Sequence, residues 1–199
     1  MKKLSIFFLS LIFLFKITAL EAYSSDPKNF VAELVNDAIE KLSSTNLSKE
    51  EKALFVEEIA LNNVDIKALG LYTLGELRKS LDKKDIENYQ QTFKSYFLKS
   101  FSSRLVDYTD PKINVVSQKV INKKYTIVNS ILEATSKRPE VKIDWRIYTK
   151  NPDKPLIRDL IVEGLSLART QKEEFNSVIQ NNDGDLNALF KNLEEFLIK

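Results

Sequence analysis

The chain has 199 residues, with 30 Lys and Arg against 28 Asp and Glu, and it contains neither cysteine nor histidine. The absence of both residue types excludes disulfide frameworks, thiolate or imidazole metal sites, cysteine nucleophiles and histidine-based triads. We therefore expect no metal and no other cofactor. Charges of both signs are interspersed, whereas nucleic-acid binding needs a cluster of uncompensated basic residues, so we also expect no nucleic-acid partner.

The first 22 residues have the features of an export signal. Lys2 and Lys3 precede an apolar run over residues 4–15, and Ala22 supplies a small residue before a suitable cleavage point. Twelve helical residues rise only about 18 Å, against a hydrocarbon core of roughly 30 Å, so the run is too short to anchor the chain. We expect residues 1–22 to be a signal peptide and residues 23–199 to form one exported domain.

The first half of that domain is predicted to be helical. The expected helix starts are Asp26-Pro27, the capping box Ser48-x-x-Glu51, Asp65 and Asp82. Apolar residues follow each start at helical spacing. We expect the third helix to end near Gly70, with another short helix over residues 71–80. The long helix that starts at Asp82 should end at Asp110-Pro111, because the residue before proline disfavours the α conformation.

An aromatic stripe marks one face of that long helix. Its residues are Phe93, Phe97, Phe101, Leu105 and Tyr108. Taken singly, each is best interpreted as ordinary core. The wall of a binding cavity would use the same residue types, and periodicity alone does not distinguish the two.

The second half is predicted to be rich in strands. Strands are expected over residues 113–121, 125–135, 141–148 and 156–167, and their short connections favour an antiparallel meander. In the third strand apolar residues alternate with Lys142, Asp144, Arg146 and Tyr148, so one face should be solvated. Helices over residues 170–181 and 185–197 close the chain. We therefore expect an α+β domain in which a four-stranded antiparallel sheet is covered on one face by several helices, with an apolar pocket between them.

The passage from the last strand into the following helix carries the most specific pattern. It contains Asp159-x-x-x-Glu163-Gly164-x-Ser166, then Phe175, and a capping box at residues 170–173 is expected to open the helix. This pattern resembles the MlaC family of periplasmic phospholipid carriers, also called the toluene-tolerance family. Further similar segments are Ala68-Leu69-Gly70-Leu71-Tyr72, the Phe93, Phe97 and Phe101 repeat, and Asp185-Leu186 with Leu189 and Leu193. Where the family commonly has Tyr-Arg, this chain has Gln171-Lys172.

The resemblance implies a monomeric carrier that shuttles glycerophospholipid through the periplasm. It would be the soluble substrate-binding component of an Mla-type ABC transport system that maintains outer-membrane lipid asymmetry. Its partners would be an inner-membrane ABC transporter complex and an outer-membrane lipoprotein–porin complex. The residues that match the family motif are Asp159, Glu163, Gly164, Ser166 and Phe175.

A carrier of this kind must enclose the lipid tails. Burial of an acyl methylene gives about 0.8 kcal/mol, so a chain of 16 carbons represents on the order of 12 kcal/mol. A deep apolar pocket between the sheet and the helices is therefore expected. The candidate lining residues are Phe93, Phe97, Phe101, Val128, Leu132, Ala134, Ile143, Trp145 and Ile147.

Two other functions fit the sequence less well. A carrier or chaperone of periplasmic lipoproteins would need a broad open groove. A hydrolase would use paired carboxylates such as Asp159 and Glu163, which lie four residues apart on the expected strand, near Asp144. Cross-strand ion pairs with Arg146 and Arg158 explain these acids more simply, and Gly164 fits a bulge or a strand end, so we expect no enzyme activity and no catalytic residue.

Overall fold

The computed structural model describes residues 23–107, 111–136 and 138–198. The expected signal peptide and Tyr108 of the aromatic stripe lie outside these ranges. The long helix ends at Leu105, with Val106 as its C-cap, and so stops before the expected end at Asp110-Pro111.

Helices form the first half of the described chain, as predicted. They are α1 (Pro27–Ser43), α2 (Lys49–Asn63), α3 (Ile66–Thr73), a single 3₁₀ turn (Leu77–Lys79) and α4 (Lys83–Leu105). All four predicted starts are confirmed, because each cap side chain accepts a hydrogen bond from a backbone N–H of the first turn. At Ser48 the capping box is complete, since Glu51 also accepts from the Ser48 backbone N–H.

Gly70 does not end α3, contrary to the expectation. The helix continues to Thr73, and the chain turns at Gly75, where φ is +56°. A Cβ atom on Gly70 would lie 2.9 Å from Cδ1 of the buried Phe93. The glycine therefore serves the close approach of α3 to α4.

The sheet has five antiparallel strands in the order β1-β2-β3-β4-β5, one more than predicted. They are β1 (Ile113–Asn122), β2 (Tyr125–Leu132), β3 (Val141–Tyr148), β4 (Leu156–Val162) and β5 (Leu165–Ser166). The predicted fourth strand divides in two because Glu163 and Gly164 both adopt positive φ, at 50° and 83°. This two-residue turn lets Leu165 pair back with Val162.

Two helices follow, α5 (Leu167–Gln180) and α6 (Leu186–Ile198). The expected start of α5 at Thr170 is wrong, because the side chain of Ser166 caps the helix one turn earlier. Thr170 instead donates its hydroxyl to the backbone carbonyl of Ser166.

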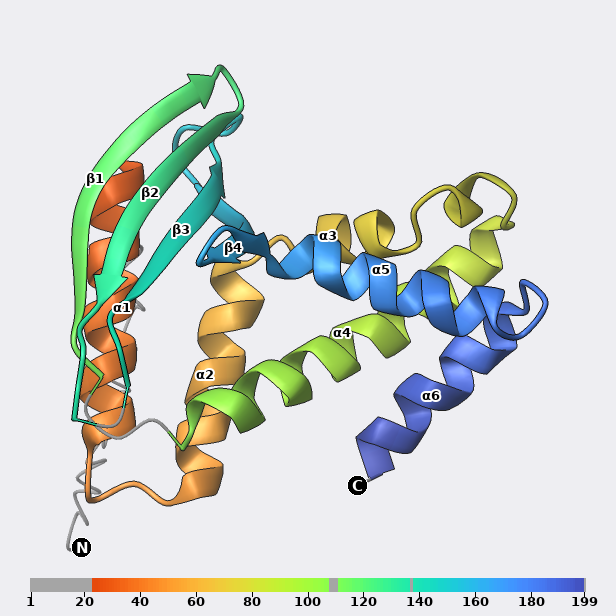
Figure 1. The fold of residues 1–199 in the computed structure, drawn as a ribbon, viewed down its shortest axis with the longest axis horizontal. Coiled ribbons are helices and arrows are strands. Elements are labelled where there is room, and N and C mark those ends of the chain that lie inside the picture. Colours follow the sequence, from red (N-terminus) through yellow and green to blue (C-terminus); the bar gives the residue numbers. More distant parts are fainter. Residues whose placement is uncertain (1–22, 108–110, 137, 199) are drawn as a thin grey trace, which may run out of the picture.

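The sheet stands at one end of the molecule, with α1 along it, and α4, α5 and α6 extend from the other side (Figure 1). The sheet and α1 share a core that contains Phe30, Val31, Val128, Trp145 and Ile147. A second core joins α3, α4, α5 and α6, and a third, smaller one joins the ends of α1, α2 and α4. The apolar residues of the described ranges thus form three separate cores, and the long helix does not share a core with the Trp145 face of the sheet.

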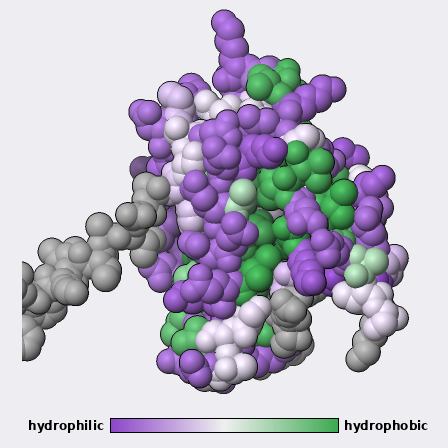
Figure 2. Space-filling model, turned by 90° about the vertical axis from the view of Figure 1, so that its left-hand side faces the viewer, coloured by the Kyte–Doolittle hydropathy of each residue, from purple (hydrophilic) through white to green (hydrophobic). Residues whose placement is uncertain are grey.

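Seen from the sheet side, apolar side chains form one larger area and a smaller group at the top, where Figure 1 places the β1–β2 turn (Figure 2). None of the helices in the described ranges combines the length and the apolar character that a membrane crossing requires.

Gly70→Ala should destabilise the fold, although alanine is the better helix former. Overpacking against Phe93 costs about 1–3 kcal/mol and outweighs the gain in helix propensity of about 1 kcal/mol. Chemical denaturation should therefore show a lower free energy of unfolding for Gly70→Ala than for the unmodified chain. Adding Phe93→Leu should make the double variant less destabilised than the sum of the two single changes, and additive losses would contradict the proposed close contact.

Candidate functional site

A hollow of about 730 Å³ lies between the sheet and helices α3 and α5. Its sheet side uses the residues that alternate with Val128 and Trp145 and therefore point away from α1. Its helix side comes from α3, the 3₁₀ turn and the first turn of α5. The lining residues are Ala68, Leu69, Leu71, Tyr72, Arg78, Ile121, Tyr125, Ile127, Asp144, Arg146, Arg158, Asp159, Ile161 and Ala168.

The lining is mainly apolar, and part of it remains in contact with solvent. Tyr72 is 41% exposed and Ile121 is 51% exposed, although both face the hollow. Isolated exposed apolar residues are ordinary on a protein surface, whereas several around one concavity are typical of a ligand site. The hollow is therefore suited to an apolar ligand.

The prediction that this face of the sheet is solvated holds only in part, because the Arg146 side chain is 43% exposed while α3 and α5 cover part of the face. The reason for the difference lies in β2. Tyr125 and Ile127 alternate with Thr126 and Val128, so both faces of this strand carry large apolar side chains. A strand that is apolar on both faces is typical of a sheet covered on both sides. That signal in β2 could have located the hollow, whereas the charged residues of the third strand concealed it.

Arg158 joins the sheet to α3 beside the hollow. Its guanidinium donates two hydrogen bonds to Asp65, of 2.7 and 2.9 Å, and one of 2.8 Å to the hydroxyl of Tyr125. It also lies 3.4 Å from the ring centroid of Tyr148. Partial burial would lower the pKa of Arg158, but the bonds to Asp65 and Tyr125 outweigh it and raise this pKa. The guanidinium therefore stays charged, and each of its three nitrogens donates a hydrogen bond.

The other arginines of the hollow differ in their partners. Arg146 lies 3.5 Å from the buried carboxylate of Asp159, which confirms one of the expected cross-strand pairs. The cross-strand pair expected for Arg158 is wrong, because Arg158 binds Asp65 before α3.

Arg78 donates to the backbone carbonyl of Leu71 at 3.1 Å and forms no ion pair within the described residues. The hydrogen bond from Lys79 lowers the pKa of the Glu76 carboxyl group, and the charge of Arg78 helps to lower it at longer range. Arg78 is therefore the cation of this site that is most available to an anionic ligand group.

The Asp159 motif forms a clasp between the sheet and α5. The two carboxylate oxygens of Asp159 accept hydrogen bonds from the Ser166 hydroxyl at 2.7 Å and the Ala168 backbone N–H at 3.0 Å. The Ser166 hydroxyl oxygen in turn accepts from the backbone N–H of Arg169. Two of the first N–H groups of α5 are thus bound, and the buried carboxylate lies at the positive end of the helix dipole.

The same clasp explains the rest of the motif. Glu163 and Gly164 form the turn that brings Ser166 back to Asp159, and the Glu163 carboxylate accepts from the backbone N–H of Lys142. Because Asp159 is 4% exposed and both its oxygens are occupied, its geometry is that of a structural group. Glu163 lies in the turn beyond the strand, so the expected pair of carboxylates on one strand face is not formed.

The phenylalanines predicted from the long helix lie in the helical cores. Phe93 and Phe97 pack in the core shared by α3 to α6, whereas Phe101 packs near the ends of α1 and α2. Their rings stack in series, with centroids 6.1 and 5.6 Å apart. Phe175 of the motif contacts Phe93 edge-on at 6.2 Å and so anchors α5 in the same core as α4.

The residues predicted from the sheet lie on the face that α1 covers. Val128, Ile143, Trp145 and Ile147 belong to the core shared with α1, Leu132 is buried at the end of β2, and Ala134 is exposed beyond it. The structure thus separates these residues from the phenylalanines of α4, and none of the nine lines either described hollow. Their contact with a ligand stays a prediction.

Gln171 and Lys172 also have observable contacts. The Gln171 side chain accepts a hydrogen bond of 3.2 Å from the Tyr96 hydroxyl. The ammonium of Lys172 lies 5.4 Å from the ring centroid of Tyr72, a cation–π contact at the edge of the hollow.

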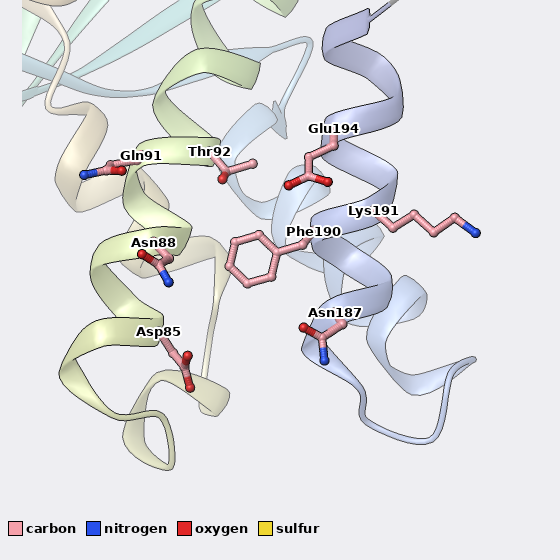
Figure 3. A pocket seen from close by; sticks show the side chains of 8 residues that line it. All are labelled: Asp85, Asn88, Gln91, Thr92, Asn187, Phe190, Lys191 and Glu194. Atoms are coloured by element: carbon pink, nitrogen blue, oxygen red, sulfur yellow. The ribbon is translucent and has the colours of Figure 1, made fainter.

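A second hollow, of about 520 Å³, lies between α4 and α6 and is mostly polar. Figure 3 shows the Phe190 ring pointing from α6 toward α4, between side chains of both helices. The other lining residues are Asp85, Asn88, Gln91, Thr92, Asn187, Lys191 and Glu194. This chemistry suits an apolar ligand less well than the hollow beside the sheet.

Comparisons with known proteins identify a family and a similar fold. The family model described as MlaC protein matches residues 32–195. The fold is similar to that of a phospholipid-binding protein from Ralstonia solanacearum, solved in complex with a phospholipid. That similarity has a TM-score of 0.69 at 18% sequence identity, and covers 84% of this chain and 94% of the other. No curated protein gives a significant sequence match.

Asp159→Ala should lower the free energy of unfolding by about 3 kcal/mol, because it removes a buried acceptor and leaves Ser166, Ala168 and Arg146 without their partner. The matched control is Asp144→Ala, which removes an acid of β3 that is less buried and accepts from Asn129. Urea unfolding should show a loss below about 1 kcal/mol for the control. Equal losses for both variants would contradict the structural role of the clasp.

Proposed function

The chain belongs to the MlaC family, and from this membership we propose that it is a periplasmic phospholipid carrier. Its ligand is a glycerophospholipid, which it shuttles between the outer and inner membranes. The observation that carries the proposal is the hollow beside the sheet, where Tyr72 and Ile121 remain exposed around an apolar concavity. The phospholipid bound to the structural neighbour supports the same ligand class.

The hollow lets the chain shield acyl chains from water. Ile127 and Ile161 on the sheet face Leu71 and Ala168 on the helices, so a tail between them would contact apolar groups on two sides. Each methylene enclosed there contributes about 0.8 kcal/mol to binding. Complete enclosure of two tails needs a wider hollow, and movement of α3 or α5 away from the sheet would provide it.

Arg78 is the group that we assign to the lipid phosphate. It lies at the helix side of the hollow, and none of the ion pairs among the described residues includes it, although the nearby Glu76 carboxylate is attracted to its charge. A guanidinium can donate two parallel hydrogen bonds to phosphate oxygens. Lys172 adds a second positive charge near Tyr72, at the same edge.

Family membership also supports a place in a transport system. We propose that the chain is the soluble component of an Mla-type ABC system, acts as a monomer, and exchanges lipid with an inner-membrane transporter complex and an outer-membrane lipoprotein–porin complex. In this role it would help to keep phospholipid out of the outer leaflet of the outer membrane.

Purification of the chain from a periplasmic extract, followed by native mass spectrometry, tests this function. We expect the protein to carry diacyl glycerophospholipid, identified by extraction and fragmentation of the bound material. Co-purification of lipoprotein with no free diacyl lipid, or an empty protein after mild purification, would contradict the proposal.

Filling the hollow should displace that lipid. Ile127→Trp and Ala168→Trp add bulk on opposite walls, so each should reduce the lipid retained per protein severalfold. The control is Leu54→Trp, which adds the same bulk to an exposed position on α2. Quantitative lipid extraction gives the measurement, and thermal unfolding shows that each variant is folded. Full lipid retention in folded Ile127→Trp and Ala168→Trp would place the lipid elsewhere.

A further inference from the structure

The hairpin formed by β1 and β2 has an unusual charge pattern. Between residues 111 and 132 it contains four lysines and no aspartate or glutamate, although the whole chain is nearly balanced in charge. Lys119, Lys123 and Lys124 gather around its turn, and none of them forms an ion pair within the described residues. The turn is therefore a local excess of positive charge.

The same turn exposes large apolar side chains. Val120 is 70% exposed and Ile121 is 51% exposed. Helix α1 does not cover them, because it begins beside Gln118, two residues before Val120. The Gln118 side chain binds the Asp26 carboxylate and the backbone N–H of Lys28 at this point. Figure 2 shows the result at the top of the molecule, where a small apolar group lies among projecting hydrophilic side chains.

A neighbouring loop enlarges the positive surface. The backbone N–H of Thr149 donates to the carbonyl of Lys124, so the β3–β4 loop lies beside the hairpin turn. This loop adds Lys150 and Lys154 against the single acid Asp153. We call the surface formed by residues 119–124 and 150–154 the hairpin tip.

We propose that the hairpin tip docks on an anionic lipid bilayer surface. Apolar side chains surrounded by lysines are the composition of interfacial membrane-binding elements, in which the apolar groups enter the headgroup region and the lysines attract anionic lipids. Addition of a partner strand at the edge is less favourable, because the β1–β2 register shifts between Val120 and Asn122. The tip therefore fits a lipid surface better than a strand of another protein.

The position of the tip has a consequence for lipid exchange. Ile121 lies in the tip and Tyr125 directly follows it, and both line the hollow, so a docked tip would hold this side of the hollow near the bilayer. This consequence rests on the proposed carrier function, whereas membrane docking does not. A vesicle-binding assay therefore tests membrane docking, and a lipid-retention assay tests the carrier function, and either proposal can be contradicted without the other.

Co-sedimentation of the exported chain, residues 23–199, with vesicles tests the proposal. We expect binding to vesicles of phosphatidylglycerol and phosphatidylcholine, and much weaker binding to phosphatidylcholine alone. Lys123→Gln with Lys124→Gln should weaken binding about 25-fold, because each lysine near an anionic surface contributes about fivefold. Val120→Ser should weaken it severalfold without changing its dependence on salt.

The controls repeat the same chemistry away from the tip. Lys83→Gln with Lys84→Gln removes two adjacent exposed lysines at the start of α4, and Leu54→Ser removes an exposed apolar residue of α2. Both control variants should bind the anionic vesicles with an affinity within about twofold of that of the unmodified chain. The proposal would be overturned if the chain bound both kinds of vesicle equally or bound neither. It would also be overturned if the tip variants and the control variants lost vesicle binding to the same extent. Lipid retained by each purified variant reports separately on the carrier function.

Discussion

The buried carboxylate of Asp159 is the constraint on which the arrangement of the sheet and the helices depends. It lies on β4, beside Arg146, and binds both the Ser166 hydroxyl and an N–H group of the first turn of α5. Since Phe175 on the same helix packs in the core of α4, α5 carries this constraint from the sheet into the helical part. This clasp holds the first turn of α5 against the sheet at one side of the hollow.

The division of the apolar core gives the sheet two different faces. The face with Trp145 is filled by α1, and Trp145 donates its indole N–H to Ser130 within that core. The opposite face, with Ile127 and Ile161, is only partly covered by α3 and α5. A carrier needs both properties, because one packed face gives stability while the other remains free to receive a ligand.

Much of the fold followed from the sequence, because its signals are local. Asp26, Ser48, Asp65 and Asp82 each cap a helix as predicted, since a cap needs only a side chain and the next three residues. The strand end expected at Gly164 is confirmed, because β4 ends at Val162. The turn back into β5 is not predictable from the sequence, because a positive φ at a glutamate is uncommon. Gly70 was misinterpreted because its role depends on Phe93, which is distant in sequence and adjacent in space.

The site was harder to predict for the same reason. The family motif was found, but its residues form the clasp, and the apolar residues chosen from the stripe and from β3 belong to packed cores. The spacing of apolar residues shows on which face of a helix or strand they lie. The position of α1, which the spacing does not give, decides which face of the sheet is filled.

A crystal structure of the exported chain with the lipid that it retains tests the central claim most directly. We expect acyl-chain density between Ile127 of the sheet and Ala168 of α5, with the phosphate near Arg78. Density between the Trp145 face and α1, or a solid core beside α5 with no ligand, would contradict this account.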